Sequence, residues 1–315
     1  MSESILSSKR FNDEQAAFDF VESKLWPEGP VCPHCAETVR IGKLKGKTTR
    51  MGLYKCYACR KPFTVTMGTI FEDSHIPLRH WLQAMYLMAA SKKGISSNQL
   101  HRTLGVTLKT AWFMTHRIRL AMNKEPNGPF GGIVEGDETY IGGKLRIGSQ
   151  AVKPGERPKD RPAHTSNKAP VFSLVQRGGS VKSYHVEKIT ARNLRPIIDK
   201  MVAKDAHLMT DTSTVLDAAG FDRKHSKVNH NEKEYVRVEN GEVITTNTIE
   251  GYFALLKRGI NGIYHHCDAK HLHRYLAEFD FRYNNRIAKG VDDLKRTDNL
   301  LQGVVGKRLT YTTSN

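Results

Sequence analysis

Three acidic residues in this chain occupy settings that suit metal-dependent chemistry. Asp137 lies within the strand-like segment 133–141, where aspartate is disfavoured. Asp211 ends a short apolar strand, and Glu250 lies in a predicted helix that begins at Asn247. Carboxylates from separate elements can together hold two divalent cations beside a phosphodiester. One cation would activate the attacking water or hydroxyl, and the other would stabilise the leaving oxygen.

The segment that carries Glu250 has a helical pattern. Glu250 and Lys257 are seven residues apart, about two helical turns, and Asn247 precedes Glu250 by about one turn. Lys257 would bind a substrate phosphate as a point charge, and Asn247 would donate to the substrate strand or orient Glu250. Taken alone, such an edge is more often a solvated helix face, and the two upstream acids favour a site. The apolar stripe on the other side is Ile249, Phe253, Leu256, Ile260 and Ile263.

The upstream acids leave alternatives open. Glu138 follows Asp137, and consecutive strand residues point to opposite faces of a sheet. We therefore expect only one of the two to face the cation, and the pattern does not decide which. Asp211 has a second interpretation as the N-cap of a short helix. For the cation itself, oxygen ligands favour Mg²⁺ or Mn²⁺.

The cysteines form a second constellation. Cys32 and Cys35 make one C-x2-C pair, and Cys56 and Cys59 make another after twenty residues. Two such pairs suit tetrahedral thiolate ligation of one structural Zn²⁺, with a thiol redox pair as the alternative. Zinc would contribute folding energy here, because about 30 residues rarely bury enough apolar surface alone.

Between these constellations the pattern predicts three helices, at 77–91, 96–104 and 107–122. Gly105 lies in the short turn between the last two, which is typical of a helix-turn-helix. An ordinary three-helix bundle is the alternative. The residues expected to face DNA are Thr107, Lys109, Thr110, His116, Arg117 and Arg119.

From residue 133 onward the composition favours strands that alternate with helices. A hairpin is predicted around Gly178, and a basic segment rich in Pro and Gly, 142–168, is predicted to be a mobile loop. Residues 224–246 are polar and are predicted to be irregular. The order of elements indicates an α/β fold with a mixed sheet flanked by helices.

The bulk composition bounds the class of partner. Forty-nine Lys and Arg against thirty-two Asp and Glu give a net charge of +17 over 315 residues. A basic globular protein of this kind usually binds a polyanion, most often nucleic acid, although a solubility role is the alternative. No apolar run approaches the roughly 20 residues of a membrane span, and the polar N-terminus predicts a cytoplasmic protein.

These patterns divide the chain into five expected segments. They are an N-terminal helical segment (1–30), a zinc ribbon (31–72), a helix-turn-helix DNA-binding domain (73–123), an α/β catalytic domain (124–290) and a basic, loosely ordered C-terminal tail (291–315).

Several short sequence motifs carry a family resemblance. They are Trp26-Pro27-Glu28-Gly29, Cys32-Pro33-His34-Cys35, Tyr54-Lys55-Cys56, Gly136-Asp137-Glu138-Thr139-Tyr140-Ile141-Gly142-Gly143-Lys144, Thr210-Asp211, Asn247-Thr248-Ile249-Glu250-Gly251-Tyr252-Phe253, Leu255-Leu256-Lys257-Arg258-Gly259-Ile260 and Phe281-Arg282-Tyr283-Asn284-Asn285-Arg286. With these motifs the chain resembles bacterial insertion-sequence transposases of the IS1595 family, which have a transposase zinc ribbon and an ISXO2-like DDE domain. The resemblance covers about residues 10–287.

The resemblance implies a ribonuclease-H-like catalytic domain and cut-and-join DNA chemistry. It places Asp137 and Asp211 as metal ligands, Glu250 at the third acidic position and Lys257 as the basic residue one heptad later. It also implies that the zinc ribbon and helix-turn-helix bind the terminal inverted repeats of the element. Joining two ends to one target needs paired active sites, so we expect a homodimer or larger assembly on double-stranded DNA, within the bacterial nucleoid.

Two other functions fit part of the sequence. A transcriptional regulator that only binds DNA explains residues 1–122 but gives the three spaced carboxylates no purpose. A ribonuclease-H-like nuclease or Holliday-junction resolvase explains the carboxylates but would cut without joining. Joined DNA products separate the transposase from both.

Overall fold

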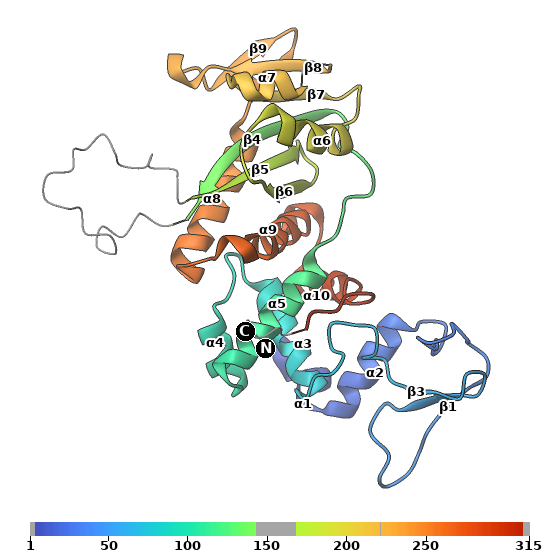
Figure 1. The fold of residues 1–315 in the computed structure, drawn as a ribbon. Helices are drawn as coiled ribbons and strands as arrows, with labels where there is room; N and C mark the ends of the chain where they lie inside the picture. Colours follow the sequence, from blue (N-terminus) through green and yellow to red (C-terminus); the bar gives the residue numbers. More distant parts are fainter. Residues whose placement is uncertain (1–3, 143–167, 221, 311–315) are drawn as a thin grey trace, which may run out of the picture. The chain divides into compact units, whose positions relative to one another are not determined.

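The computed structural model describes residues 4–142, 168–220 and 222–310 (Figure 1). Its internal contacts divide the chain into two units, one made of Met1–Lys124 with Asn285–Asn315 and the other of Glu125–Asn284. The loop predicted at 142–168 lies almost wholly outside the described residues. No helix among those described is long and apolar enough to cross a membrane.

The second unit, Glu125–Asn284, is built on a five-stranded mixed sheet. Its strand order is β6-β5-β4-β7-β8; β5 is antiparallel to both β6 and β4, whereas β7 is parallel to both β4 and β8. Gly178, at φ +69°, supplies the left-handed residue that the tight β5–β6 turn needs. This order and these directions are those of a ribonuclease-H-like fold. The strands are β4 (Ile133–Ile141), β5 (Ala169–Gln176), β6 (Val181–His185), β7 (His207–Asp211) and β8 (Lys224–Val228).

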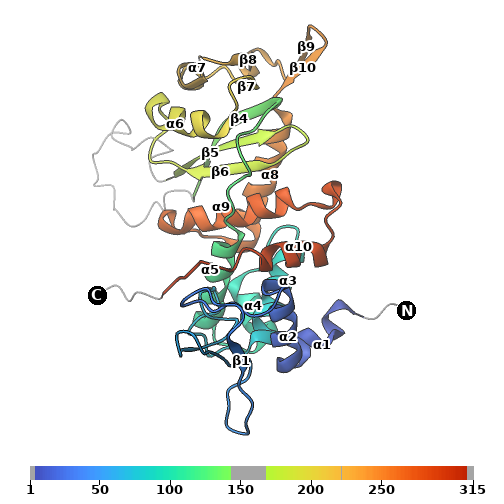
Figure 2. The same ribbon diagram turned by 90° about the vertical axis from the view of Figure 1, so that its right-hand side faces the viewer.

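Helices cover both faces of this sheet (Figure 2). On β5, Phe172 and Leu174 contribute to one apolar cluster with α6 and α7, whereas Val171 and Val175 contribute to a second cluster with α8 and α9. Because side chains alternate along a strand, β5 contributes residues to two cores, one on each face of the sheet. The helices are α6 (Ala191–Met201), α7 (Thr214–Gly220), α8 (Asn247–Gly259) and α9 (Ala269–Asn284), and a π-helical turn (Ile260–Tyr264) follows α8.

The segment 224–246 is more regular than its composition predicts. It holds β8, a short 3-10 turn (His230–Glu232) and a hairpin of β9 (Val236–Glu239) and β10 (Glu242–Thr245). The prediction was wrong here because β8 is an edge strand whose residues are mostly exposed or half-buried, so it carries little apolar signal. Ile244 of β10 is buried against Met209 and Val228 and so attaches the hairpin to β7 and β8.

The first unit joins a small three-stranded ribbon to a helical group. Asp13 caps α2 by accepting the N–H of Ala16, and Thr107 caps α5 by accepting that of Thr110. Gly105 is left-handed, φ +67°, between α4 and α5. The elements are α1 (Lys9–Asn12), α2 (Glu14–Leu25), β1 (Ile41–Lys43), β2 (Tyr54–Cys56), β3 (Pro62–Phe63), α3 (Leu78–Ala90), α4 (Ser97–Leu104), α5 (Leu108–Met122) and α10 (Asp293–Leu301), with 3-10 turns at Ile5–Ser7 and Ile287–Lys289.

The C-terminal segment 291–310 packs on other parts of the first unit, in contrast to the loosely ordered tail expected. Leu300 and Leu301 of α10 are buried, and Val304 accepts the N–H of Ile70. Lys307 donates to three carbonyl oxygens at the end of α5, including that of Leu120 at 3.0 Å. Basic residues near the chain end therefore complete the first unit, where the polar composition had suggested a tail.

Candidate functional site

Two parallel strands bring Asp137 and Asp211 together. Strand β4 pairs with β7 as far as Glu135, which lies opposite Met209. Continuing this register by two residues places Asp137 level with Asp211, just beyond the last paired residues. The carboxyl ends of parallel strands meet at one edge of a sheet, which is the usual place for a ligand in such folds.

Glu138 joins these two residues, so the expectation that only one of Asp137 and Glu138 faces the site was wrong. Carboxylate oxygens of Asp137, Glu138 and Asp211 lie within 4.8 Å of one another. An oxygen of Asp137 accepts the N–H of Glu138 at 2.7 Å, so this side chain folds back along its own strand. Because β7 pairs with β4 only as far as Glu135, the edge is open there and both side chains can approach Asp211.

The surroundings of this acidic cluster oppose the ionisation of its three carboxyl groups. Burial raises the pKa of Asp137 to about 7, and the charges of Asp211, Glu138 and Glu250 add to the rise. Burial also raises the pKa of Glu138, with a contribution from Asp211. Burial raises the pKa of Asp211 as well, while the charge of His230 opposes that rise.

Two oxygens in the cluster fit a cation. Glu138 Oε2 and Asp211 Oδ1 are buried and have no hydrogen-bond partner among the described residues. Leaving a buried charged oxygen without a partner is costly, and a divalent cation would satisfy both at once. The donor set is all oxygen, which suits a hard cation such as Mg²⁺ or Mn²⁺. The residues present therefore fit a divalent metal.

Glu250 lies beside this trio rather than in it. The cluster whose oxygens share the 4.8 Å limit holds Asp137, Glu138 and Asp211 only, among the residues described. Glu250 Oε1 accepts from Thr246 Oγ1 at 3.1 Å and lies 3.2 Å from His230 Nε2. Glu250 is nevertheless close enough to raise the pKa of Asp137, after burial and the nearer acids.

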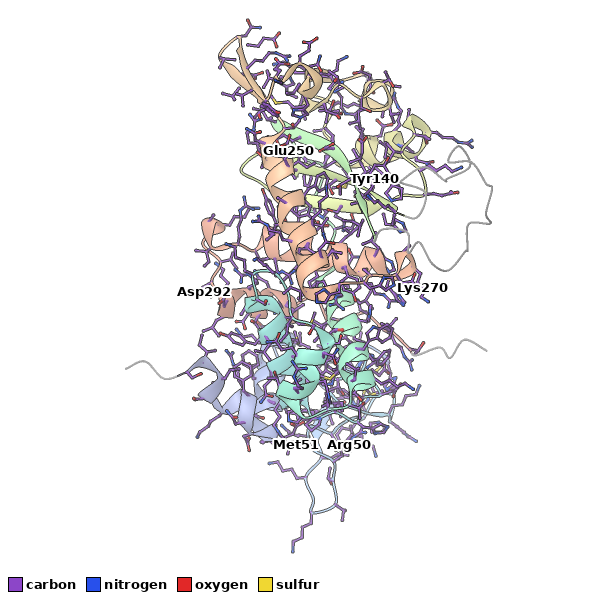
Figure 3. The ribbon with its side chains drawn as sticks, turned by 90° about the vertical axis from the view of Figure 1, so that its left-hand side faces the viewer. Arg50, Met51, Tyr140, Glu250, Lys270 and Asp292 are labelled. Atoms are coloured by element: carbon purple, nitrogen blue, oxygen red, sulfur yellow. The ribbon has the colours of Figure 1, made fainter. Side chains whose placement is uncertain are left out.

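The predicted edge of α8 is exposed as expected. Asn247, Glu250 and Lys257 are all solvent-exposed, whereas Ile249 and Leu256 of the predicted apolar stripe are buried. Figure 3 shows Glu250 at the first turn of α8. The roles of Asn247, Glu250 and Lys257 in substrate binding stay predictions.

A buried ion pair that the sequence did not reveal connects the elements of the site. Glu135, which is fully buried, accepts from Arg177 Nε and Nη2 at 3.0 and 2.9 Å. The same carboxylate accepts the hydroxyl of Thr248 at 2.8 Å and the N–H of Ile249 at 3.0 Å. Glu135 precedes Asp137 by two residues on β4, and Ile249 precedes Glu250 on α8. One side chain thus ties the strand of Asp137 to the first turn of the helix of Glu250.

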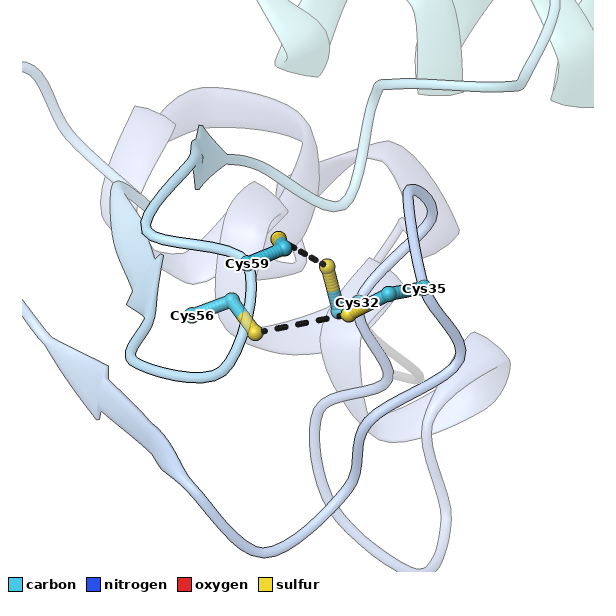
Figure 4. Close-up of side chains that lie close together, drawn as sticks. All are labelled: Cys32, Cys35, Cys56 and Cys59. Atoms are coloured by element: carbon cyan, nitrogen blue, oxygen red, sulfur yellow. Dashed lines mark hydrogen bonds between the residues drawn. The ribbon is translucent and has the colours of Figure 1, made fainter.

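The four cysteines predicted as zinc ligands converge in the ribbon (Figure 4). The Sγ atoms of Cys32 and Cys59 are 3.7 Å apart, and those of Cys35 and Cys56 are 3.6 Å apart. Four sulfurs at about 2.3 Å from one tetrahedral ion would stand about 3.8 Å apart. The cluster can therefore hold one structural Zn²⁺ with little rearrangement.

The structure separates the predicted DNA-facing residues into two groups. Thr107 and Lys109 are exposed at the start of α5, and Thr110 is half-buried beside them. Arg117 and Arg119, in contrast, are buried, and so is His116. Arg117 donates to the carbonyl oxygens of Ile70, Glu72 and Leu309, and Arg119 to the hydroxyl of Thr115.

The prediction that Arg117 and Arg119 face DNA was therefore wrong. Helix α5 is covered along its second half by α10 and the segment that follows it, so these guanidinium groups serve the interior of the first unit. Alternate positions on a helix can be basic without being exposed when a later part of the chain covers them.

Comparison with known proteins agrees with this architecture. Residues 129–284 match the family model of the ISXO2-like transposase domain, and residues 12–62 match that of the transposase zinc-ribbon domain. An uncharacterized protein in transposable element ISH50 of Halobacterium salinarum is 29% identical over 80% of this chain and 85% of its own length.

Two solved structures are similar to the chain at low TM-scores. A chain of the simian T-cell lymphotropic virus intasome in complex with PP2A regulatory subunit B56 gamma is 16% identical, with a TM-score of 0.27 over 57% of this chain and 63% of that one. A chain of the pre-cleavage Mos1 transpososome is 12% identical, with a TM-score of 0.18 over 64% and 75%. These likenesses are distant, and the fold is assigned from the strand order.

The sheet, its acidic cluster and the two family matches define a transposase. The chain belongs to the IS1595 family and carries both the zinc ribbon and the ISXO2-like domain of that family.

Proposed function

We propose that this transposase cuts phosphodiester bonds at the ends of its insertion sequence and joins the freed 3′-hydroxyl to target DNA. The observation that supports this chemistry best is the pair of buried, unpartnered oxygens of Glu138 and Asp211 beside Asp137. Such an arrangement is costly in an empty protein and useful only with a cation and a substrate.

We assign Asp137, Asp211 and Glu250 as the ligands of Mg²⁺ or Mn²⁺, with Glu138 as a fourth acid within reach. A divalent cation bound there would supply the positive charge that activates the attacking oxygen and stabilises the leaving oxygen. The chain's own part is to gather the carboxylates at one sheet edge, and to hold them there through the Glu135–Arg177 pair.

The exposed edge of α8 would hold the DNA strand. Lys257 would contact a phosphate next to the scissile bond as a compact charge, and Asn247 would donate to the strand or orient Glu250. The net charge of +17 on the chain favours binding of double-stranded DNA. Thr107, Lys109 and Thr110 at the start of α5 are the residues that we propose contact the terminal inverted repeats.

The zinc ribbon and the helical group would bind the element ends, and the α/β unit would carry out the reaction. Joining two ends to one target requires two active sites, so we propose that the chain acts as a dimer or larger assembly on DNA. Structural Zn²⁺ in the ribbon would be needed for end binding alone.

The test is an in vitro reaction with end-containing DNA, target DNA and Mg²⁺. Asp211→Asn should lower cleavage and joining by about 10³-fold, because several kcal/mol of charge stabilisation is lost, while binding of element ends is unchanged. Asp268→Asn, at an exposed acid paired with Lys270, is the matched control and should leave the reaction intact.

The products distinguish the remaining functions. Cleavage without joined products would identify a nuclease or resolvase, and end binding without cleavage would identify a DNA-binding regulator. Normal joining by Asp211→Asn would remove that residue from the reaction and with it the proposed site.

A further inference from the structure

His230 is a neighbour of the acidic site that neither the sequence patterns nor the proposed reaction uses. It lies in the 3-10 turn between β8 and β9. Its Nε2 is 3.2 Å from Glu250 Oε1 and 3.2 Å from Thr246 Oγ1, and the Thr246 hydroxyl itself donates to Glu250 Oε1. The imidazole, the hydroxyl and the carboxylate form a closed triangle at the rim of the site.

The imidazole is held in place from its other side. The ring of Tyr235 packs against it with centroids 5.4 Å apart, so the histidine cannot easily turn away. Glu250 is about half as exposed as a free side chain, yet its Oε1 accepts from the Thr246 hydroxyl and lies 3.2 Å from His230 Nε2. A carboxylate on the surface that is held in this way is positioned, where most exposed carboxylates are free to rotate.

This contact explains why Glu250 lies outside the trio of Asp137, Glu138 and Asp211. The side chain begins on the first turn of α8, which the Glu135 pair fixes beside β4. Its carboxylate nevertheless turns toward His230 and Thr246 on the hairpin side. Turning the carboxylate toward the trio breaks these contacts at Oε1, and that exchange lowers the apparent affinity for the cation.

We propose that His230 is a positioning residue that holds Glu250 at the rim of the site until a divalent cation recruits it. The inference rests on the proposed function, because it takes Glu250 as the third cation ligand. The hold does not need a charged histidine, since a neutral imidazole with its proton on Nε2 can donate to Thr246 Oγ1, whose own hydroxyl donates to Glu250. The trio forms the first cation site, and release of Glu250 completes it.

The test measures cation binding without DNA and without turnover. Mn²⁺ alone is titrated calorimetrically into the full-length, zinc-loaded protein. His230→Ala should lower the dissociation constant for Mn²⁺ at least threefold, because Glu250 then has only the Thr246 hydroxyl to leave. His230→Gln, whose amide can still donate, should stay near the wild-type value. His266→Ala, at an exposed histidine beyond the other end of α8, is the matched control and should change nothing.

A double-mutant cycle shows whether the effect passes through Glu250. Glu250→Gln should weaken Mn²⁺ binding, and adding His230→Ala to it should have no further effect. An unchanged dissociation constant for His230→Ala, or an equal change in the Glu250→Gln background, would overturn the inference. Weaker binding by His230→Ala would do so too, because it would make the histidine itself a ligand.

One further variant separates this inference from the proposed function. Asp137→Asn should abolish Mn²⁺ binding if the acidic cluster is the cation site. Normal binding by Asp137→Asn would reject the cation site itself. Loss of binding there, together with an unchanged His230→Ala, would reject only the role of His230. Circular dichroism of each variant confirms that it is folded, and His230→Gln supplies a second, milder substitution.

Discussion

The cysteine cluster and the acidic cluster are both candidate metal sites, and they are built in opposite ways. The four cysteines come from 28 consecutive positions, Cys32 to Cys59, and their sulfurs already stand at tetrahedral separation. Two of the acids, Asp137 and Asp211, come from strands and are 74 residues apart. Glu138 Oε2 and Asp211 Oδ1 have no hydrogen-bond partner among the described residues. A local motif closes its shell by itself, whereas the acidic site depends on the whole sheet.

This difference predicts different consequences when each site is disturbed. The ribbon has only a small apolar group around its sulfurs, which includes Tyr54 and Phe63, so its metal is part of its folding energy. The acidic cluster sits on a sheet with two large cores, so the sheet should survive without a cation. The acidic cluster instead lowers the stability of the folded chain electrostatically, because three carboxyl groups lie close together.

The largest predicted effect is that of zinc removal on the ribbon. Structural Zn²⁺ binding contributes about 10–16 kcal/mol in small zinc domains, which exceeds the stability of most domains. Chelation, or Cys56→Ser, should unfold residues 31–65 and abolish binding of element ends. Trp26 packs on Tyr54 and Phe63 in the ribbon, so tryptophan fluorescence reports the loss.

The α/β unit provides the control for that experiment. All three tryptophans, Trp26, Trp81 and Trp112, lie in the first unit, so far-UV circular dichroism must follow the sheet. The sheet signal and Mn²⁺ binding should persist after chelation. A chelated protein that still binds element ends normally would contradict the assignment of the ribbon.

Local patterns predicted the local parts of both sites well. The segment 133–141 has the predicted bounds, and the helix that begins at Asn247 has the predicted starting point and a clear apolar period. The C-x2-C pairs needed no tertiary information. The relation between Asp137 and Glu138 was predicted wrongly, because strand alternation fixes only the direction of each Cβ. Where the chain ends its pairing with β7, side-chain length and hydrogen bonds decide the rest.

The next largest effect concerns the ion pair that links the elements of the acidic site. Arg177→Met would leave the buried Glu135 carboxylate without its cation, with only the Thr248 hydroxyl and the Ile249 N–H as donors, which costs about 3–5 kcal/mol. The α/β unit should be destabilised by that amount in urea, as followed by circular dichroism. Mn²⁺ affinity should also fall, since the Glu135 carboxylate that joins β4 to α8 at Ile249 loses its charge partner.

Two observations would separate this role from general damage. Arg177→Lys keeps the charge but loses the second hydrogen bond to Glu135, so it should recover part of the stability. The tryptophan transition of the first unit should not move in either variant. A shift of that transition, or wild-type Mn²⁺ affinity in Arg177→Met, would contradict the role assigned to the pair.

The Glu135–Arg177 pair and the His230–Glu250 contact escaped prediction for the same physical reason. Their partners are 42 and 20 residues apart and lie on elements whose register is set only by the packed sheet. The burial of Arg117 under the C-terminal segment was hidden in the same way. Sequence patterns give each element its buried face, but they do not give the later part of the chain that covers a charged residue.

The smallest predicted effect is a stabilising one, and it tests the electrostatic cost of the acidic cluster directly. Asp137 has a pKa of about 7 in the folded, cation-free chain, raised mainly by burial, against an ordinary value of 3.8. Between these values the folded protein retains a proton that the unfolded chain has lost, so stability falls as pH rises through this window. Asp137→Asn should therefore stabilise the α/β unit by about 1 kcal/mol or more at pH 8, and by nothing near pH 4. Urea unfolding in buffer with Zn²⁺ but without Mg²⁺ or Mn²⁺ measures this difference, and Asp268→Asn, which removes a carboxyl group whose pKa Lys270 lowers, should not stabilise the unit at pH 8. Saturating Mn²⁺ should reverse the order at pH 8, because only the wild type gains a bound cation. Equal stabilities at both pH values would mean that the three carboxyl groups share their charge at no cost, and the contrast with the cysteine cluster would be lost.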